Sequence, residues 1–145
     1  MLATLRAAVA DPTQVKTRAI DLHANAHDAS HFLLVPQAVV VAGNAREVGA
    51  LMSASAAQGM PLTFRSGGTS LSGQAVTDGV LVDVRRNFRD IEVLDDGGRV
   101  RVQPGATVRA LNARLARYGR KFGPDPASES ACTIGGVVAN NSSGM

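Results

Sequence analysis

The chain has 145 residues, of which 45% are hydrophobic, and this is enough to bury the core of one ordinary globular domain. A net charge of +3 with acidic residues interspersed, and only four Phe and one Tyr for base stacking, argue against nucleic-acid binding. One cysteine excludes an internal disulfide, and no stretch approaches the roughly 20 apolar residues of a membrane span, so we expect a cytoplasmic protein or one peripheral to the inner membrane.

Residues 1–35 are predicted to be a helical lead-in to the domain that follows. Residues 1–10 favour a short amphipathic helix, which Pro12 stops. Three histidines recur at every fourth position, a spacing that on one helix face could hold a metal: His23, His27 and His31. Pro36 ends any helix soon afterwards and no carboxylate completes a site, so we interpret them as surface histidines and expect no bound metal.

A strand–helix–strand unit is predicted from residue 38 onward. The apolar run 38–41 is typical of a strand buried on both faces. Asn44 can cap the next helix, with Glu47 reaching back as in a capping box, and Gly59 ends that helix. Residues 62–64 form the next predicted strand, parallel to the first. The helix carries an apolar stripe of Val48, Leu51 and Met52.

The following segment predicts one more strand, then a hairpin and a helix. Residues 80–84 are a further apolar strand. Strands at 91–94 and 99–103 are joined by Asp95-Asp96-Gly97-Gly98, a strong hairpin signal. Thr107 can cap a helix that Gly119 closes. One face of that helix carries Val108, Leu111, Leu115 and Tyr118.

Residues 66–74 form a loop of glycines and hydroxyl residues directly after a strand. Gly67 and Gly68 can adopt positive φ, so that successive N–H groups converge into an anion-binding concavity. Such a loop suits a phosphate or pyrophosphate, although a glycine-rich surface turn is the alternative interpretation. It is not a P-loop, because Gln74-Ala75 stands where Lys followed by Ser or Thr would be needed, and no G-x-G-x-x-G dinucleotide turn occurs here.

A second segment with small side chains covers residues 133–144. Gly135-Gly136 would let the backbone approach a flat ring, and the following Asn and Ser residues can bond ring heteroatoms. Two such loops together favour a large phosphate-bearing cofactor. The chain stops inside this Gly/Asn/Ser run with no closing element before it, and we therefore expect the natural protein to continue.

Two long motifs make the chain resemble a known family. FRSGGTSLSGQAVTDGVLVDV, followed by GPDPASESACTIGGVVANNSSGM, resembles the FAD domain of the vanillyl-alcohol oxidase and PCMH flavoprotein superfamily, over about residues 28–145. The sequence is most similar to the D-lactate and D-2-hydroxyacid dehydrogenase branch, which also holds glycolate oxidases and includes members fused to an iron–sulfur half. The resemblance implies an α/β (α+β) fold, with a small parallel βαβ subdomain followed by the start of an antiparallel one. Residues 36–145 would be this FAD-binding domain, truncated at its C-terminal end.

The resemblance also implies which residues hold the cofactor. The FAD pyrophosphate would lie on Ser66, Gly67, Gly68, Thr69, Ser70 and Gly73. The flavin end and ribityl chain would be lined by Pro124, Asp125, Cys132, Thr133, Gly135, Gly136, Asn141 and Gly144. Some relatives hold flavin covalently through a His directly after the two loop glycines. Here that position is Thr69, so non-covalent FAD is expected.

The activity implied is oxidation of a D-2-hydroxyacid, such as D-lactate or D-2-hydroxyglutarate, by FAD. Electrons would pass on to a quinone, a cytochrome or an iron–sulfur partner. The catalytic residues of this branch lie downstream of Met145, so none is assigned here and the chain alone is expected to be inactive. Two alternatives stay open: a sugar or alcohol oxidase of the same superfamily, and a non-catalytic nucleotide- or phosphate-binding module.

Overall fold

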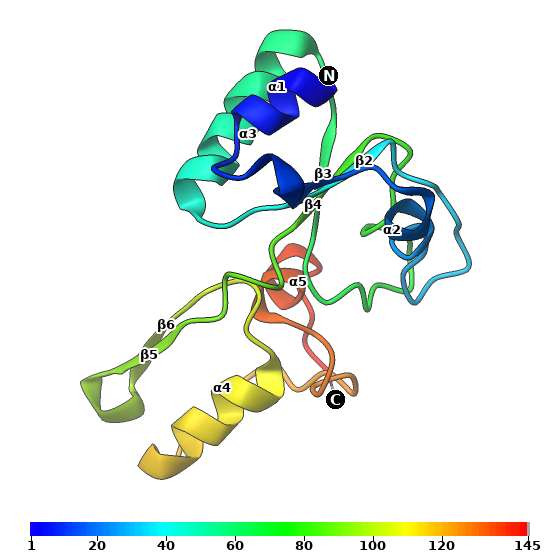
Figure 1. Ribbon diagram of the computed structural model, residues 1–145. Coiled ribbons are helices and arrows are strands. Elements are labelled where there is room, and N and C mark those ends of the chain that lie inside the picture. The colour runs from blue at the N-terminus through cyan, green and yellow to red at the C-terminus, as the bar shows by residue number, and fades with distance from the viewer. Residues whose placement is uncertain (145) are drawn as a thin grey trace.

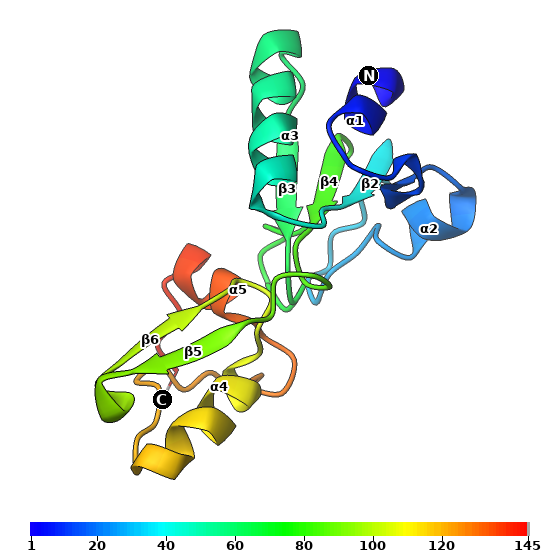
Figure 2. The same ribbon diagram turned by 60° about the vertical axis from the view of Figure 1, so that its left-hand side comes forward.

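The computed structural model describes residues 1–144, which form two lobes that lie one above the other in Figures 1 and 2. The strands of the first lobe are β1 (Val15–Lys16), β2 (Ala38–Val41), β3 (Leu62–Arg65) and β4 (Val80–Asp83). Those of the second lobe are β5 (Ile91–Leu94) and β6 (Arg99–Val102). The helices are α1 (Leu2–Ala7), α2 (Ala19–His23), α3 (Ala45–Gln58), α4 (Val108–Leu115) and α5 (Ile134–Ala139). Short 3₁₀ turns are η1 (Pro12–Gln14), η2 (Asp95–Gly97) and η3 (Ala116–Tyr118).

The first lobe is built on a sheet with strand order β1-β2-β4-β3. Both β2 and β3 run parallel to β4, as the strand–helix–strand pattern predicted, but β4 lies between them. Burial explains this position, because Val80, Leu81 and Val82 are all fully buried and a central strand is covered on both faces. The antiparallel edge strand β1, paired through Val15 and Val40, was not anticipated, since two residues carry no periodicity.

The core of the first lobe combines the sheet with helices α1 and α3. Leu5 of α1 is fully buried in it, and so is Leu51 of α3. The predicted stripe on α3 is wrong at Met52, which is 56% exposed, because it lies one residue, or 100°, past Leu51. Helix α1 ends at Ala7 rather than at Pro12, and the proline instead begins η1, where a missing N–H costs nothing.

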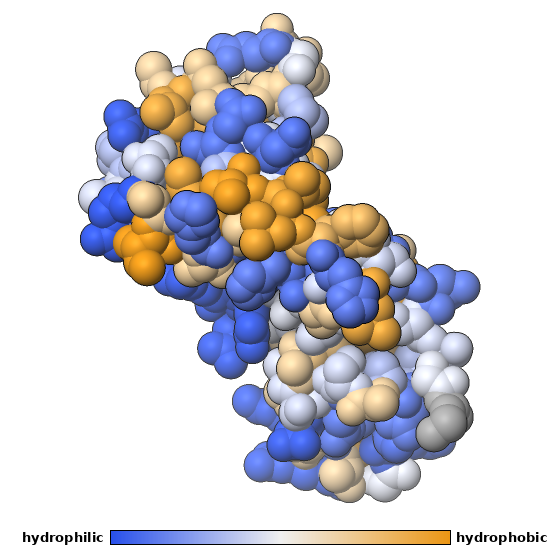
Figure 3. Space-filling model, turned by 90° about the vertical axis from the view of Figure 1, so that its right-hand side faces the viewer, coloured by the Kyte–Doolittle hydropathy of each residue, from blue (hydrophilic) through white to orange (hydrophobic). Residues whose placement is uncertain are grey.

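One side of the first lobe carries exposed apolar residues. Figure 3 shows hydrophobic surface gathered on the side where α2 lies. The large exposed apolar residues from this part of the chain are Ile20, Phe32, Leu33, Leu34 and Val35. The lead-in therefore supplies both buried core residues and an exposed apolar face.

The second lobe packs the β5–β6 hairpin against α4 and α5. The hairpin has the predicted antiparallel pairing, from Ile91 with Val102 to Leu94 with Arg99. Tyr118 is 44% exposed rather than buried, because the chain leaves the α-helix for η3 after Leu115. The segment around Gly135-Gly136 was expected to be a loop, but it is helix α5. Tertiary packing of Ile134 and Val137 overrides the poor helix propensity of the two glycines.

The three regularly spaced histidines do not share a helix face. Helix α2 ends at His23, and His27 instead forms an isolated bridge with Leu33. Within residues 1–144, no group of three His, Cys, Asp or Glu side chains is placed to hold a metal ion. Nor does the described part of the chain contain a helix with the length and apolar character to cross a bilayer.

A buried carboxylate, Glu47, ties the N-terminal segment to α3. It is 5% exposed and accepts hydrogen bonds from the N–H of Gly43 (2.7 Å) and Ala10 (3.2 Å) and from the side chains of Gln14 (2.8 Å) and Asn44 (3.3 Å). Asn44 caps α3 as predicted, although the Glu47 carboxylate bonds Gly43 N–H instead of the Asn44 backbone. Burial acts to raise the pKa of Glu47, but the four hydrogen bonds together lower it below its ordinary value of 4.5.

Replacing Glu47 by Gln should destabilise the first lobe by about 1.5–3 kcal/mol, because the amide NH₂ would face two donors in either orientation. The pKa of Glu47 is lower in the folded state than in the unfolded state. The stabilisation by its ionised carboxylate is therefore complete above about pH 4.5 and is lost as the pH falls through the pKa of the folded state. Urea unfolding of the parent and E47Q at pH 7 and at pH 3 measures it. The exposed Glu92→Gln is the matched control; equal effects of the two substitutions at pH 7 would contradict the buried role of Glu47.

Candidate cofactor site

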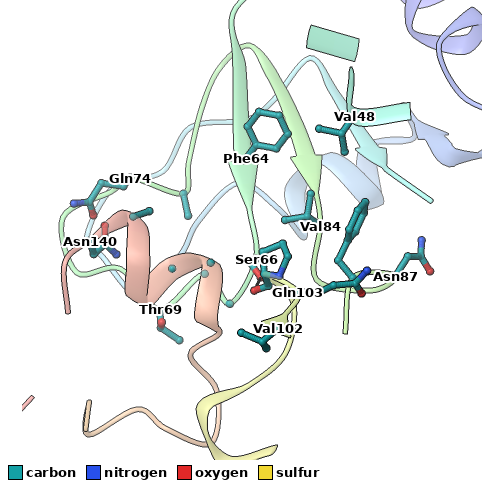
Figure 4. A pocket seen from close by; sticks show the side chains of 18 of the residues that line it. Val48, Phe64, Ser66, Thr69, Gln74, Val84, Asn87, Val102, Gln103 and Asn140 are labelled. Carbon is teal, nitrogen blue, oxygen red and sulfur yellow. Dashed lines mark hydrogen bonds between the residues drawn. The ribbon is translucent and has the colours of Figure 1, made fainter. Parts of the chain in front are cut away.

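A cleft of about 820 Å³ lies between the two lobes and is lined by residues of both (Figure 4). Its volume is within the range of small-molecule and cofactor pockets, about 300–1,000 Å³. From the first lobe it is lined by the β2–α3 junction at residues 43–45, by Val48 and Phe64, and by the glycine loop. From the second lobe come the end of β6 at residues 102–104 and one face of α5. The connection 84–90 between the lobes completes the wall, with Val84, Asn87, Phe88 and Asp90.

The glycine loop (residues 66–74) begins at the carboxyl end of β3. Hydrogen bonds to residues 25–29 hold its first residues in place. The guanidinium of Arg65 donates to the carbonyls of Asn25 (3.2 Å) and His27 (2.8 Å). Ala29 N–H donates to the carbonyl of Gly68 (3.1 Å). Burial lowers the pKa of Arg65, against the opposing effect of nearby carboxylates, yet an arginine stays charged at physiological pH. A fixed positive charge therefore lies beside the loop.

The N–H groups of Gly68, Thr69 and Ser70 are available to a ligand. Within residues 1–144, none of the three donates to a protein acceptor, and all three residues line the cleft. Gly68 has φ of +66°, the left-handed region that was predicted for both loop glycines, whereas Gly67 does not have positive φ. A Cβ at Gly68 would also lie 2.8 Å from the Arg65 guanidinium. Three successive free donors are suited to a phosphate or pyrophosphate, and the Arg65 guanidinium lies next to Gly68 but outside the lining of the cleft.

The two glycines of α5 have different surroundings. A Cβ at Gly135 would lie 2.7 Å from Pro104 Cβ, and its N–H donates to the Pro104 carbonyl (3.0 Å), so this glycine permits close packing of α5 on the β6–α4 turn. At Gly136 the nearest atom to such a Cβ is the Thr133 hydroxyl at 3.9 Å. Gly136 therefore leaves open space on the cleft side of the helix.

About half of the cofactor-binding residues that the family resemblance implied line the cleft. Those that line it are Ser66, Gly67, Gly68, Thr69, Ser70, Gly135 and Gly136. Among the described residues that lie elsewhere are Gly73, Pro124, Asp125, Cys132, Thr133, Asn141 and Gly144. Gly73 packs on Phe32, and Asp125 pairs with Gly144 in an isolated bridge. Cys132 and Thr133 are buried behind the glycine loop.

The sequence reasoning missed the apolar and amide residues of the cleft wall. Figure 4 shows Phe64, Val48 and Val84 close together beside the sheet, with Asn87 and Gln103 nearby. Phe64 lies in the predicted strand 62–64, which is the edge strand β3 of the sheet, and its side chain is 41% exposed beside the cleft. Asn87 donates to the carbonyl of Ala42 at 3.0 Å, a contact across 45 residues that no local pattern signals.

Comparison with known proteins shows the family of this chain. A family described as "FAD binding domain" matches residues 36–145, well over half of the chain. The chain belongs to this family of FAD-binding domains. It is 37% identical over 124 residues to a D-2-hydroxyglutarate dehydrogenase of Pseudomonas putida, covering 83% of the chain and 12% of that protein. It is 33% identical over 109 residues to a D-lactate dehydrogenase of Archaeoglobus fulgidus, covering 74% and 24%.

Solved structures confirm the PCMH-type fold of this FAD-binding domain. An alkyldihydroxyacetonephosphate synthase superposes with a TM-score of 0.82 at 21% identity, covering 99% of the chain and 29% of that protein. A p-cresol methylhydroxylase superposes with a TM-score of 0.71 at 15% identity, covering 94% and 28%. The chain thus spans less than a third of the length of each of these relatives, and the likeness to the solved structures shows the fold alone.

Gly68→Val should weaken FAD binding by more than about 2 kcal/mol, roughly 30-fold in Kd, because a β-branched residue at positive φ displaces the free N–H groups. Titration with FAD, followed by flavin fluorescence, measures the change. Ser72→Ala is the control, since Ser72 is exposed and lies off the cleft. If the two variants lose affinity equally, the loop does not bind through its backbone.

Proposed function

We propose that this chain is the FAD-binding portion of a flavin-dependent oxidoreductase that oxidises a D-2-hydroxyacid, such as D-lactate or D-2-hydroxyglutarate. The observation that carries the proposal is a row of three N–H groups without a protein acceptor, at residues 68–70 of the described chain, in residues that line a cleft of cofactor size. The substrate class is supported by the names of the relatives, which include D-2-hydroxyglutarate, glycolate and D-lactate enzymes.

The residues of the cleft fit FAD in two respects. The free donors of the glycine loop, beside the charged Arg65, suit the pyrophosphate. Apolar side chains also line the cleft and suit the two ring systems that the pyrophosphate joins: Val48 and Phe64 from the first lobe, Val84 and Phe88 from the connection, and Val102 and Ala139 from the second lobe. We propose direct contacts for the cleft-lining residues, and supporting roles for the other positions that the resemblance implied.

When bound, FAD supplies the capacity to accept a hydride. What this chain contributes is binding and orientation, because Asp90 is the single ionisable side chain among the described residues that line the cleft. Within residues 1–144, no histidine or lysine is placed there to move a proton or to hold a substrate carboxylate. We propose that the groups that bind and oxidise the substrate belong to a further part of the protein, and that electrons leave through a quinone, a cytochrome or an iron–sulfur partner.

FAD should be held non-covalently. Thr69 follows the two loop glycines, and a threonine hydroxyl does not form the histidyl–flavin bond of some relatives. Acid precipitation of the yellow protein is expected to release the flavin into the supernatant. Flavin fluorescence that stays with the pellet would contradict non-covalent binding.

The 145-residue chain should bind FAD weakly and show no dehydrogenase activity, whereas a version extended to the length of the relatives should bind FAD tightly and be active. A chain that holds only part of a binding site makes fewer contacts with FAD, but it still loses the conformational entropy of ordering the loop. Both versions are titrated with FAD and assayed with D-lactate and D-2-hydroxyglutarate. Reduction of FAD by the short chain with either substrate would overturn the placement of catalysis outside it; failure of the extended protein to bind FAD would overturn the proposed function.

A further inference from the structure

Thr133 connects the glycine loop to the second lobe through its hydroxyl group. It is 1% exposed, at the start of α5, and its Oγ1 accepts a hydrogen bond from Gly67 N–H (3.1 Å). The same hydroxyl donates to Ser66 Oγ (2.7 Å), which in turn donates to the carbonyl of Pro104 (2.9 Å). The chain of bonds thus runs from the end of β3 to α5 and on to the turn after β6.

Every hydroxyl and amide proton in this series of hydrogen bonds already has an acceptor. A hydroxyl carries one proton and can also accept. Thr133 gives its proton to Ser66, and Ser66 gives its own to Pro104, while Gly67 supplies the amide proton that Thr133 accepts. Neither hydroxyl has a proton left for a ligand, and Thr133 does not reach the cleft.

The backbone on either side of these bonds is packed too closely for a larger residue. A Cβ at Gly67 would lie 3.0 Å from the Ala131 carbonyl oxygen and 3.2 Å from Cys132 Cα. Residues 66–67 are therefore held against residues 131–133 of the second lobe. The three residues that follow, 68–70, line the cleft, and their N–H groups donate to no protein acceptor in the described chain.

We infer that Thr133 is a positioning residue for the cofactor loop, and that it acts without contacting FAD. By holding Gly67 N–H it directs the following three N–H groups into the cleft, and through Ser66 and Pro104 it sets the distance between the lobes on either side of the cofactor. This inference rests on the proposed function for its FAD-binding consequence, whereas its structural part concerns the chain alone. It gives Thr133 a different role from the flavin contact that the sequence resemblance implied.

Thr133→Val tests the inference, because valine has nearly the shape of threonine but lacks the hydroxyl. Amide hydrogen exchange at Gly67, read by NMR on the cofactor-free chain, is expected to become on the order of tenfold faster, the change that corresponds to losing a bond worth about 1.4 kcal/mol. FAD affinity is expected to fall by a similar factor. Thr133→Ser keeps the hydroxyl and should restore both values.

Thr107→Val is the matched control for a merely structural effect. Thr107 lies beside Thr133 in an isolated bridge, and its hydroxyl caps α4 by accepting from Ala110 N–H (3.1 Å). Its replacement should lower the unfolding temperature without a local change at Gly67. Ser66→Ala, which interrupts the same chain of bonds from a less buried position, should also speed exchange at Gly67 and serves if T133V does not fold.

The outcomes separate the inference from the proposed function. Unchanged exchange at Gly67 in both T133V and S66A, or equal effects of T133V and T133S, would overturn the role of Thr133. Faster exchange at Gly67 in T133V, combined with a parent protein that binds no FAD at any length, would instead uphold the positioning of the loop and defeat the function proposed for it.

Discussion

The parallel pairing of β3 with β4 is the constraint on which the rest of the molecule depends. Parallel strands end at the same edge of a sheet, and ligand sites of open α/β sheets lie at that carboxyl edge. The chain leaves β3 as the glycine loop and leaves β4 as the connection into the second lobe, so both walls of the cleft start from neighbouring strand ends. Asn44, which follows β2, reaches the same edge.

Close backbone contacts help to place the second lobe. A Cβ at Gly105 would lie 2.5–2.7 Å from the carbonyl oxygens of Phe88, Arg85 and Val84, and the Gly105 N–H donates to Phe88 at 2.7 Å. The turn after β6 is thereby fixed on the connection between the lobes. Together with the hydrogen bond between the Ser66 and Thr133 side chains, this contact fixes the second lobe at two places.

Electrostatics near the loop also follow from burial. Burial acts to raise the pKa of Asp28, but hydrogen bonds from Ser30 and from Ala75 N–H lower it by more, so the carboxylate stays ionised close to Arg65. Residues 25–29 thus supply carbonyls and a charge that hold the Arg65 guanidinium beside Gly68. The lead-in is in this way part of the support of the site.

Local pattern alone determined the hairpin, the capped helices α3 and α4, the buried strands and the glycine loop, because each depends on periodicity or turn chemistry within a few residues. Only the tertiary structure decided that β4 separates β2 from β3, that residues 134–139 are helical and that Thr133 faces the loop and not the cleft. The physical reason is that these features depend on contacts between residues far apart in the sequence. A glycine or a threonine has the same local preferences whether it meets a ligand or a neighbouring backbone, and contacts spanning 66 residues decide which of the two it meets.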